Sequence, residues 1–387
     1  MLRLLALVAL CLFANVESLR TTRTQESARV ARATRQWLAD VEDVPSYQKE
    51  QSSGLRDGTV GAAGKVTELV RQYFAGAKQR GGRLQNVGAN AQFINDMQSR
   101  GIALLEGMTS LPSARDEAWK YTSLKTLFQH NYQHSSTPVV IAGEVAPFLT
   151  QYIDSNCNHS HMVFVDGHFS PEHSDVTALK GDAGGVTFTT LSKLDASLLE
   201  HQRTLLESNR VDTDEQPRNS YASDTLSALG LANAADAAVV RVPAGVSVPV
   251  PLQVIFYSSA RASKEHLAAY PSLIIDAEEG ASLRIKQTFI GGGSGTGTGS
   301  GAGAGEDESQ GCLVVGNTRV AVARGASVCH TYEQDLPSTA RHIEVVSADV
   351  QGGGRLAFFS LSSLCLSLSF APSLAHSSPF HTSLHKI

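Results

Sequence analysis

Cysteine and histidine side chains gather in one segment, and such sulfur and nitrogen ligands could bind zinc or iron. The segment CNHSHMVFVDGHFSPEH contains Cys157, His159, His161, His168 and His173. Its spacing differs from that of a closed zinc site. Because the segment leads into a predicted strand, alternation would place these side chains on both faces. We interpret it as a polar loop; the alternative is a metalloenzyme whose metal centre is this cluster.

A second pair of metal-ligating types, Cys329 and His330, lies within a predicted strand. Adjacent residues of a strand point to opposite faces, so the two cannot chelate one ion together. The pattern predicts a small core cysteine beside a surface histidine. The acidic run DAEE at 276–279 is predicted to be a solvated turn, and Cys312 is assigned no role.

Signature motifs of hydrolases and of nucleotide-binding proteins are absent from the sequence: there is no G-x-S-x-G, no H-E-x-x-H and no P-loop. The Gly-rich run 291–311 matches G-x-G-x-x-G only through its simple composition, and we interpret it as a flexible loop. The net charge of −5 does not indicate a nucleic-acid partner. We therefore assign no catalytic, cofactor-binding or metal-binding residue, and predict a protein that is not an enzyme.

The N-terminus has the composition of a targeting segment. An apolar run from Leu4 to Phe13 is typical of a signal peptide, and the Arg-rich, acid-poor stretch after Ser18 is typical of a transit peptide. Together they predict import into the stroma of a plastid with extra membranes; the alternative is a secreted protein with a basic pro-segment.

The five cysteines are odd in number and irregularly spaced, which indicates a reducing compartment. No other run is long enough to span a membrane, so the mature form is predicted to lack a membrane span.

Both helices and strands, recognised by the spacing of their apolar residues, are predicted to position these residues. Apolar spacing predicts helices at 65–79, 91–107, 191–209 and 219–235, the second of them weakened or ended near Gly101. Short β-type runs at 139–143, 162–169 and 186–191 predict strands.

From residue 238 onward the chain repeats one plan: a β run, a turn with glycine, and another β run. The turn glycines are Gly245, Gly280, Gly325 and either Gly353 or Gly354. Allowing for the insertion at 291–311, the period is roughly 25–35 residues, which predicts a β-helix-like stack. A β-sandwich is the alternative architecture.

Three stretches resemble the SufB/SufD family of iron–sulfur cluster assembly proteins, and the similarity runs from about 65 to 359. The first, LPSARDEAWKYTSL at 111–124, is similar to the N-terminal signature of the SufD branch; its DEAWKYTSL part is expected to be a structural junction. The others are MVFVDGHFSPEHSD at 162–175 and SLIIDAEEGASLRIKQTFIG at 272–291. The resemblance implies a mainly β fold, a right-handed parallel β-helix preceded by helices. It also implies a scaffold that works with SufB and SufC, in which SufC hydrolyses ATP and an iron–sulfur cluster passes through the assembled complex.

The last residues depart from the family pattern. The family continues into further repeats and a helical region that docks SufC, whereas 360–387 is an aberrant low-complexity tail. We therefore expect a chain truncated at its C-terminus, without that docking region, and carry no role over to His376, His381 or His385. The predicted divisions are a signal peptide (1–18), a transit-peptide-like segment (19–40), a helical region with the signature (41–135), a mixed α/β connecting region (136–237), the β-helix repeats (238–359) and the tail (360–387).

A different class of function stays open at this point: a β-solenoid binding module of the secretory route, for example for carbohydrate, without cluster chemistry. Such a module would need aromatic side chains exposed along its repeats. The sequence offers few candidates for this role: Phe256, Tyr257, Phe289, Tyr332, Phe358 and Phe359.

Overall fold

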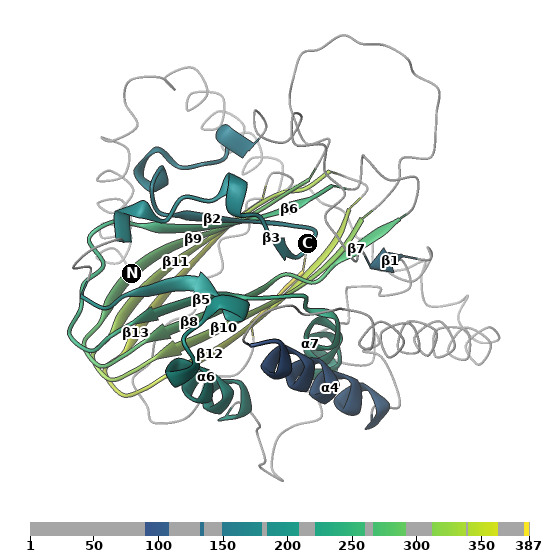
Figure 1. The fold of residues 1–387 in the computed structure, drawn as a ribbon, viewed down its shortest axis with the longest axis horizontal. Coiled ribbons are helices and arrows are strands. Elements are labelled where there is room, and N and C mark those ends of the chain that lie inside the picture. Colours follow the sequence, from purple (N-terminus) through teal and green to yellow (C-terminus); the bar gives the residue numbers. More distant parts are fainter. Residues whose placement is uncertain are drawn as a thin grey trace, which may run out of the picture. The chain divides into compact units, whose positions relative to one another are not determined.

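A computed structural model describes the architecture of the repeats and of the elements beside them (Figure 1). It describes residues 90–107, 132–134, 149–179, 184–208, 221–259, 266–291, 312–337, 340–362 and 383–386. All of these lie in one compact unit, Ala63–Ile387. The N-terminal targeting segment, the predicted helix at 65–79, the signature at 111–124, the strand at 139–143 and residues 292–311 lie outside the described residues.

Three predicted helices are present. They are α4 (Ala91–Gly107), α6 (Ala196–Ser208) and α7 (Tyr221–Asn233), and short 3-10 turns occur at η5 (Ser155–Cys157), η6 (Pro171–His173), η7 (Thr177–Leu179) and η8 (Leu191–Lys193). The helix predicted from residue 191 starts later because the Asp195 side chain accepts a hydrogen bond from the Ser197 backbone N–H, which caps α6. No helix within the described ranges is long and apolar enough to cross a membrane.

The prediction that the helix 91–107 weakens or ends near Gly101 is wrong. Helix α4 continues through Gly101, which is buried against α7. A Cβ atom at Gly101 would lie 2.5 Å from the Ala232 backbone nitrogen and 2.9 Å from the Ala228 carbonyl oxygen. Glycine is therefore required here because two helix backbones approach closely, and not because the helix stops.

The strands form two sheets in which most neighbours are parallel. Antiparallel pairs occur only at β4–β5, β2–β3 and β12–β14 among the described strands. The first sheet contains β1 (Gln133–His134), β4 (Thr187–Thr190), β5 (Ala238–Val242), β7 (Leu267–Ala269), β8 (Ser272–Ala277), β10 (Cys312–Val322), β12 (Arg341–Val350) and β14 (Ser383–Lys386). The second sheet contains β2 (His161–Val165), β3 (His168–Phe169), β6 (Leu252–Ser258), β9 (Ser282–Gly291), β11 (Ser327–Asp335) and β13 (Arg355–Ser362).

From β5 to β13 the chain passes back and forth between the two sheets, and each pass pairs in parallel with the previous pass in the same sheet (Figure 1). The chain passes from the first sheet to the second at Gly245, Gly280, Gly325 and Gly353, whose φ angles are 71°, 69°, 70° and 77°. These values confirm the predicted turn glycines, since side-chain-bearing residues rarely adopt positive φ. The β-sandwich alternative is wrong, because a sandwich is built from antiparallel strands.

Apolar side chains from both sheets fill the space between them. Val240 and Ile275 of the first sheet belong to the same buried cluster as Val254 and Ile285 of the second. The next residues along the first sheet, such as Val239, point the other way and are covered by α4 and η8. Both faces of the first sheet are therefore buried, as is usual for parallel strands.

Aromatic rings from five strands of the second sheet form a ladder, which we call the inner aromatic ladder. Its neighbouring ring centroids lie 5.4, 5.1, 5.3 and 6.2 Å apart, and its members in order are Phe164, Phe256, Phe289, Tyr332 and Phe358. Of the six aromatics considered for a binding module, Phe359 alone is exposed. The repeats therefore use their aromatic rings as core, and the exposed array that the binding module would need is not formed by these residues.

Candidate functional site

Six polar side chains lie together between the two sheets, and we call them the inner polar cluster. All six are buried, and they come from β9, β10, β11 and β12: Gln287, Thr318, His330, Tyr332, His342 and Glu344. On each strand, these polar side chains point to the same face as core side chains such as Val320 and Val328. The strand period therefore directs them inward among apolar neighbours, where an unpaired polar group is costly.

A chain of hydrogen bonds links the four strands of the cluster. The Thr318 hydroxyl donates to Glu344 Oε1 at 2.6 Å. The Gln287 amide donates to the Thr318 oxygen at 2.9 Å, and His330 Nε2 donates to Gln287 Oε1 at 3.0 Å. Through these bonds, the carboxylate of β12 is connected to the imidazole of β11 on the opposite sheet.

His330 is held neutral by its surroundings. Its Nε2 carries the proton because Gln287 Oε1 can only accept, and its Nδ1 has no hydrogen-bond partner. A second proton on Nδ1 would create a charge that neither water nor protein solvates. Burial accordingly lowers the pKa of His330 to about 3.

Tyr332, His342 and Glu344 form the second half of the cluster. Burial, and then the charge of Glu344, raises the pKa of Tyr332 well above its usual value, so its hydroxyl stays protonated. This hydroxyl shares a hydrogen bond of 3.2 Å with His342 Nδ1. His342 Nε2 lies 3.8 Å from Glu344 Oε2, an oxygen without a hydrogen-bond partner.

The Glu344 carboxylate fits between the sheets only because its neighbour on β10 is glycine. Gly316 and Glu344 are direct partners in the parallel ladder. A Cβ atom at Gly316 would overlap the Glu344 carboxylate, with 2.7 Å to its Cδ atom. The absence of a side chain at Gly316 thus leaves the space that the Glu344 carboxylate occupies.

We expect Gly316→Ala to lower the free energy of unfolding by about 3 kcal/mol, the upper part of the range for overpacking a core. In a Glu344→Ala background the same substitution should cost at least about 1 kcal/mol less, since the clash partner is gone. Urea denaturation of the two single variants and the double variant measures this coupling. Additive costs would contradict the assigned contact. Gly352→Ala, where a Cβ meets nothing within 4 Å, is the matched control.

The structure does not bring the five side chains of the 157–173 segment together. Buried Cys157 donates through its thiol to the Pro251 carbonyl at 3.5 Å, and His161 Nδ1 donates to the Cys157 carbonyl at 2.9 Å. His159 is exposed and donates to Asp175. The other two side chains have separate neighbours: His173 lies 2.7 Å from the Ser170 hydroxyl, and the His168 ring meets that of His134.

The interpretation of this segment as a polar loop needs one correction. It contains η5, β2, β3 and η6, and His161 is a buried residue of β2. Its members are separated because they lie on different elements, and not by alternation along one strand.

The face assignment of Cys329 and His330 is also wrong. The two point to opposite faces as predicted, but His330 is the buried residue, and Cys329 is half-buried on the outer face. The parity of β11 is set by Val328 and Tyr332, which must both face the core, and His330 lies between them. Polarity alone misled the prediction because the interior holds a hydrogen-bond partner for this imidazole.

The described cysteines are unpaired and poor nucleophiles. Burial raises the pKa of Cys157 to about 11 and that of Cys312 to about 12, and it also raises the pKa of Cys329. All three therefore stay protonated near neutral pH, whereas a cluster ligand must be a thiolate. Cys312, which the sequence left without a role, is a buried residue at the start of β10.

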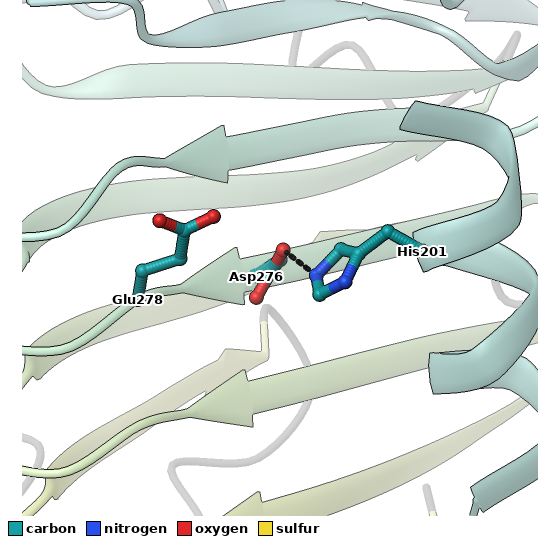
Figure 2. Close-up of side chains that lie close together, drawn as sticks. All are labelled: His201, Asp276 and Glu278. Atoms are coloured by element: carbon teal, nitrogen blue, oxygen red, sulfur yellow. Dashed lines mark hydrogen bonds and ion pairs between the residues drawn. The ribbon is translucent and has the colours of Figure 1, made fainter. Parts of the chain in front are cut away.

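A third correction concerns the acidic run at 276–279. Asp276 is a buried residue of β8, whereas the run was predicted to be a solvated turn. It lies beside Glu278 and beside His201 of α6, and the three side chains form the group drawn in Figure 2. Because His201 and Asp276 are 75 residues apart, no local sequence signal could have paired them.

Comparison with known proteins gives one family match that covers part of the chain. Residues 68–254 match the family model described as the SufBD protein N-terminal region. This match spans α4, α6 and α7, the strands β1 to β5, and the start of β6.

Two relatives carry related descriptions. An iron–sulfur cluster assembly SufBD family protein of Synechocystis is 25% identical over 193 residues, which is 49% of this chain and 38% of that protein. The iron–sulfur cluster assembly protein SufD of Escherichia coli is 36% identical over 73 residues, which is 19% of this chain and 16% of that protein. The chain thus spans well under half the length of both relatives. The family model, whose match includes the stretch at 111–124, and the two relatives support the assignment of this chain to the SufB/SufD family.

Proposed function

We propose that this protein is a SufD-like scaffold subunit in iron–sulfur cluster assembly, acting with SufB-type and SufC-type partners to build and transfer clusters. The observation that carries the proposal is the SufBD family match over 68–254, together with the similarity to a protein named SufD. ATP hydrolysis is assigned to the SufC-type partner.

The chemistry of the described cysteines supports a scaffold role. Cys157 and Cys312 are buried thiols whose raised pKa values disfavour the thiolate that binds iron or accepts sulfur. The buried polar groups between the sheets are connected by hydrogen bonds from Gln287, Thr318 and His330. These features fit a subunit that supplies shape and contact surface, with the cluster passing through the assembled complex.

We further propose that the alternating strands form a right-handed parallel β-helix. The regular change of sheet at four positive-φ glycines and the in-register parallel pairing support this architecture. Crossover connections between parallel strands are almost always right-handed. An experimental structure that showed left-handed or non-sequential passes would contradict it.

The cellular site that we propose is a plastid stroma, based on the signal-like residues 1–18 and the Arg-rich residues 19–40. A fluorescent fusion of residues 1–40 is expected to enter the plastid. A fusion carrying residues 1–18 alone should stop in the secretory route. Secretion of both fusions would contradict the proposal.

Co-expression of the full chain with the SufB-like and SufC-like proteins of its own organism tests the proposed partnership. We expect the three to co-elute in size-exclusion chromatography. The Phe359→Ala variant, which leaves the core intact, is a folded comparison for surface effects. A monomeric, folded chain that captures neither partner would overturn the proposed partnership while leaving family membership untouched.

A further inference from the structure

Three potential metal ligands converge at the end of β8, away from the inner polar cluster. His201 reaches from α6 toward Asp276, and Glu278 follows just beyond the end of the strand (Figure 2). One ligand atom from each lies within 4.8 Å of the others. Among the residues that the structure describes, this is the one group of three His, Cys, Asp or Glu side chains with such proximity.

The distances are close to those of a coordination sphere. His201 Nε2 and Asp276 Oδ2 are 2.8 Å apart. Two ligands of a tetrahedral zinc ion, with bonds of about 2.1 Å, are separated by about 3.4 Å. Small rotations of His201 and of the flexible Glu278 side chain would bring the three atoms to that separation.

Charge and burial favour a cation at this position. The Asp276 side chain is only 6% exposed, whereas that of His201 is 46% exposed and open to solvent. A buried carboxylate is poorly solvated, and the direct partner of this one is the His201 imidazole. Burial accordingly raises the pKa of Asp276.

A nearby arginine competes for the same carboxylates. Arg241 forms an ion pair with Glu278, whose other oxygen accepts the Ala244 N–H at 3.1 Å. Arg241 is also the ladder partner of Asp276 on β5. An ion would have to share Glu278 with this guanidinium, so the affinity should be moderate and should rise when Arg241 is removed.

We propose that His201, Asp276 and Glu278 form a binding site for a divalent first-row transition ion such as zinc. The imidazole selects such ions over Mg²⁺, which prefers oxygen ligands alone. The site combines one nitrogen and two carboxylate ligands, and solvent can reach it from the His201 side. The proposal does not depend on the role in cluster assembly.

Isothermal titration with Zn²⁺ tests the site on the full chain, purified without a histidine tag. We expect His201→Gln and Glu278→Gln each to lose one equivalent of Zn²⁺, with affinity at the site falling about 100-fold. Arg241→Gln should bind about tenfold more tightly, and excess Mg²⁺ should not displace Zn²⁺. The matched control is Glu279→Gln, which removes the neighbouring exposed carboxylate and should change the affinity less than about twofold.

Circular dichroism and urea midpoints without metal establish that each variant is folded. If wild-type protein and the His201→Gln variant bind Zn²⁺ with the same stoichiometry and affinity, the proposal is overturned. It is equally overturned if Arg241→Gln fails to tighten binding, since the ion would then lie elsewhere.

Discussion

Lowering the pH from 7.5 to 4.5 is expected to cost the wild-type protein about 3 kcal/mol more in unfolding free energy than the His330→Gln variant. The folded pKa of His330 is about 3, below its ordinary value of 6.5. As the pH falls through 6.5, the unfolded chain takes up a proton and the folded protein does not. Stability is therefore lost between pH 6.5 and 3, at about 1.4 kcal/mol per pH unit.

The measurement is urea denaturation of both proteins across this pH range. Glutamine at position 330 can still hydrogen-bond to Gln287 but cannot take up a proton. Carboxylates that titrate in both proteins cancel in the difference. His159→Gln, at a side chain that is 71% exposed, is the matched control and should shift the profile by less than about 1 kcal/mol. Parallel stability curves for wild type and His330→Gln would refute the assignment.

Phe289→Ala is expected to lower the free energy of unfolding by about 3–5 kcal/mol, the range for removing a buried phenylalanine. Phe289 is 1% exposed and lies at the middle of the inner aromatic ladder. Its ring centroid is 5.1 Å from that of Phe256, 5.3 Å from that of Tyr332 and 4.4 Å from that of His342. The substitution would leave a cavity between two sheets that cannot easily close, because both are held by continuous ladders.

The matched control is the same substitution at Phe359, which is 38% exposed and should cost less than about 1 kcal/mol. Urea denaturation of both variants gives the comparison. If Phe289→Ala does not fold, Phe289→Leu keeps most of the volume and should lose less than about 1.5 kcal/mol. Equal losses for the variants at 289 and 359 would show that the ladder contributes no more than a surface ring.

Much of the fold was predictable because its signals are local. The turn glycines follow from a backbone angle that other residues avoid, so Gly245, Gly280 and Gly325 could be identified without knowing any contact. Helix and strand periods placed α4, α7 and the repeated strands near their observed bounds. Gly101 was misinterpreted because its reason is a contact with α7, which follows more than a hundred residues later.

The site residues were less predictable because polarity does not determine which way a strand side chain points. Residue types predicted an inward Cys329 and an outward His330, and a solvated Asp276. The observed orientation follows from register: once Val328 and Tyr332 face the core, so does His330. If the strand had been shifted by one residue, Cys329 would have faced the core and His330 the outside, as predicted.

By itself the sequence determined the resemblance to the SufB/SufD family, the alternation of helix and strand periods, and the positions of the turns. Each of these depends on neighbouring residues or on a contiguous signature. Tertiary structure alone decided that Gly316 makes room for Glu344, that His330 meets Gln287 and that His201 meets Asp276. These contacts depend on how successive strands stack and on where a helix docks. The local conformational preferences of the chain determine neither of these.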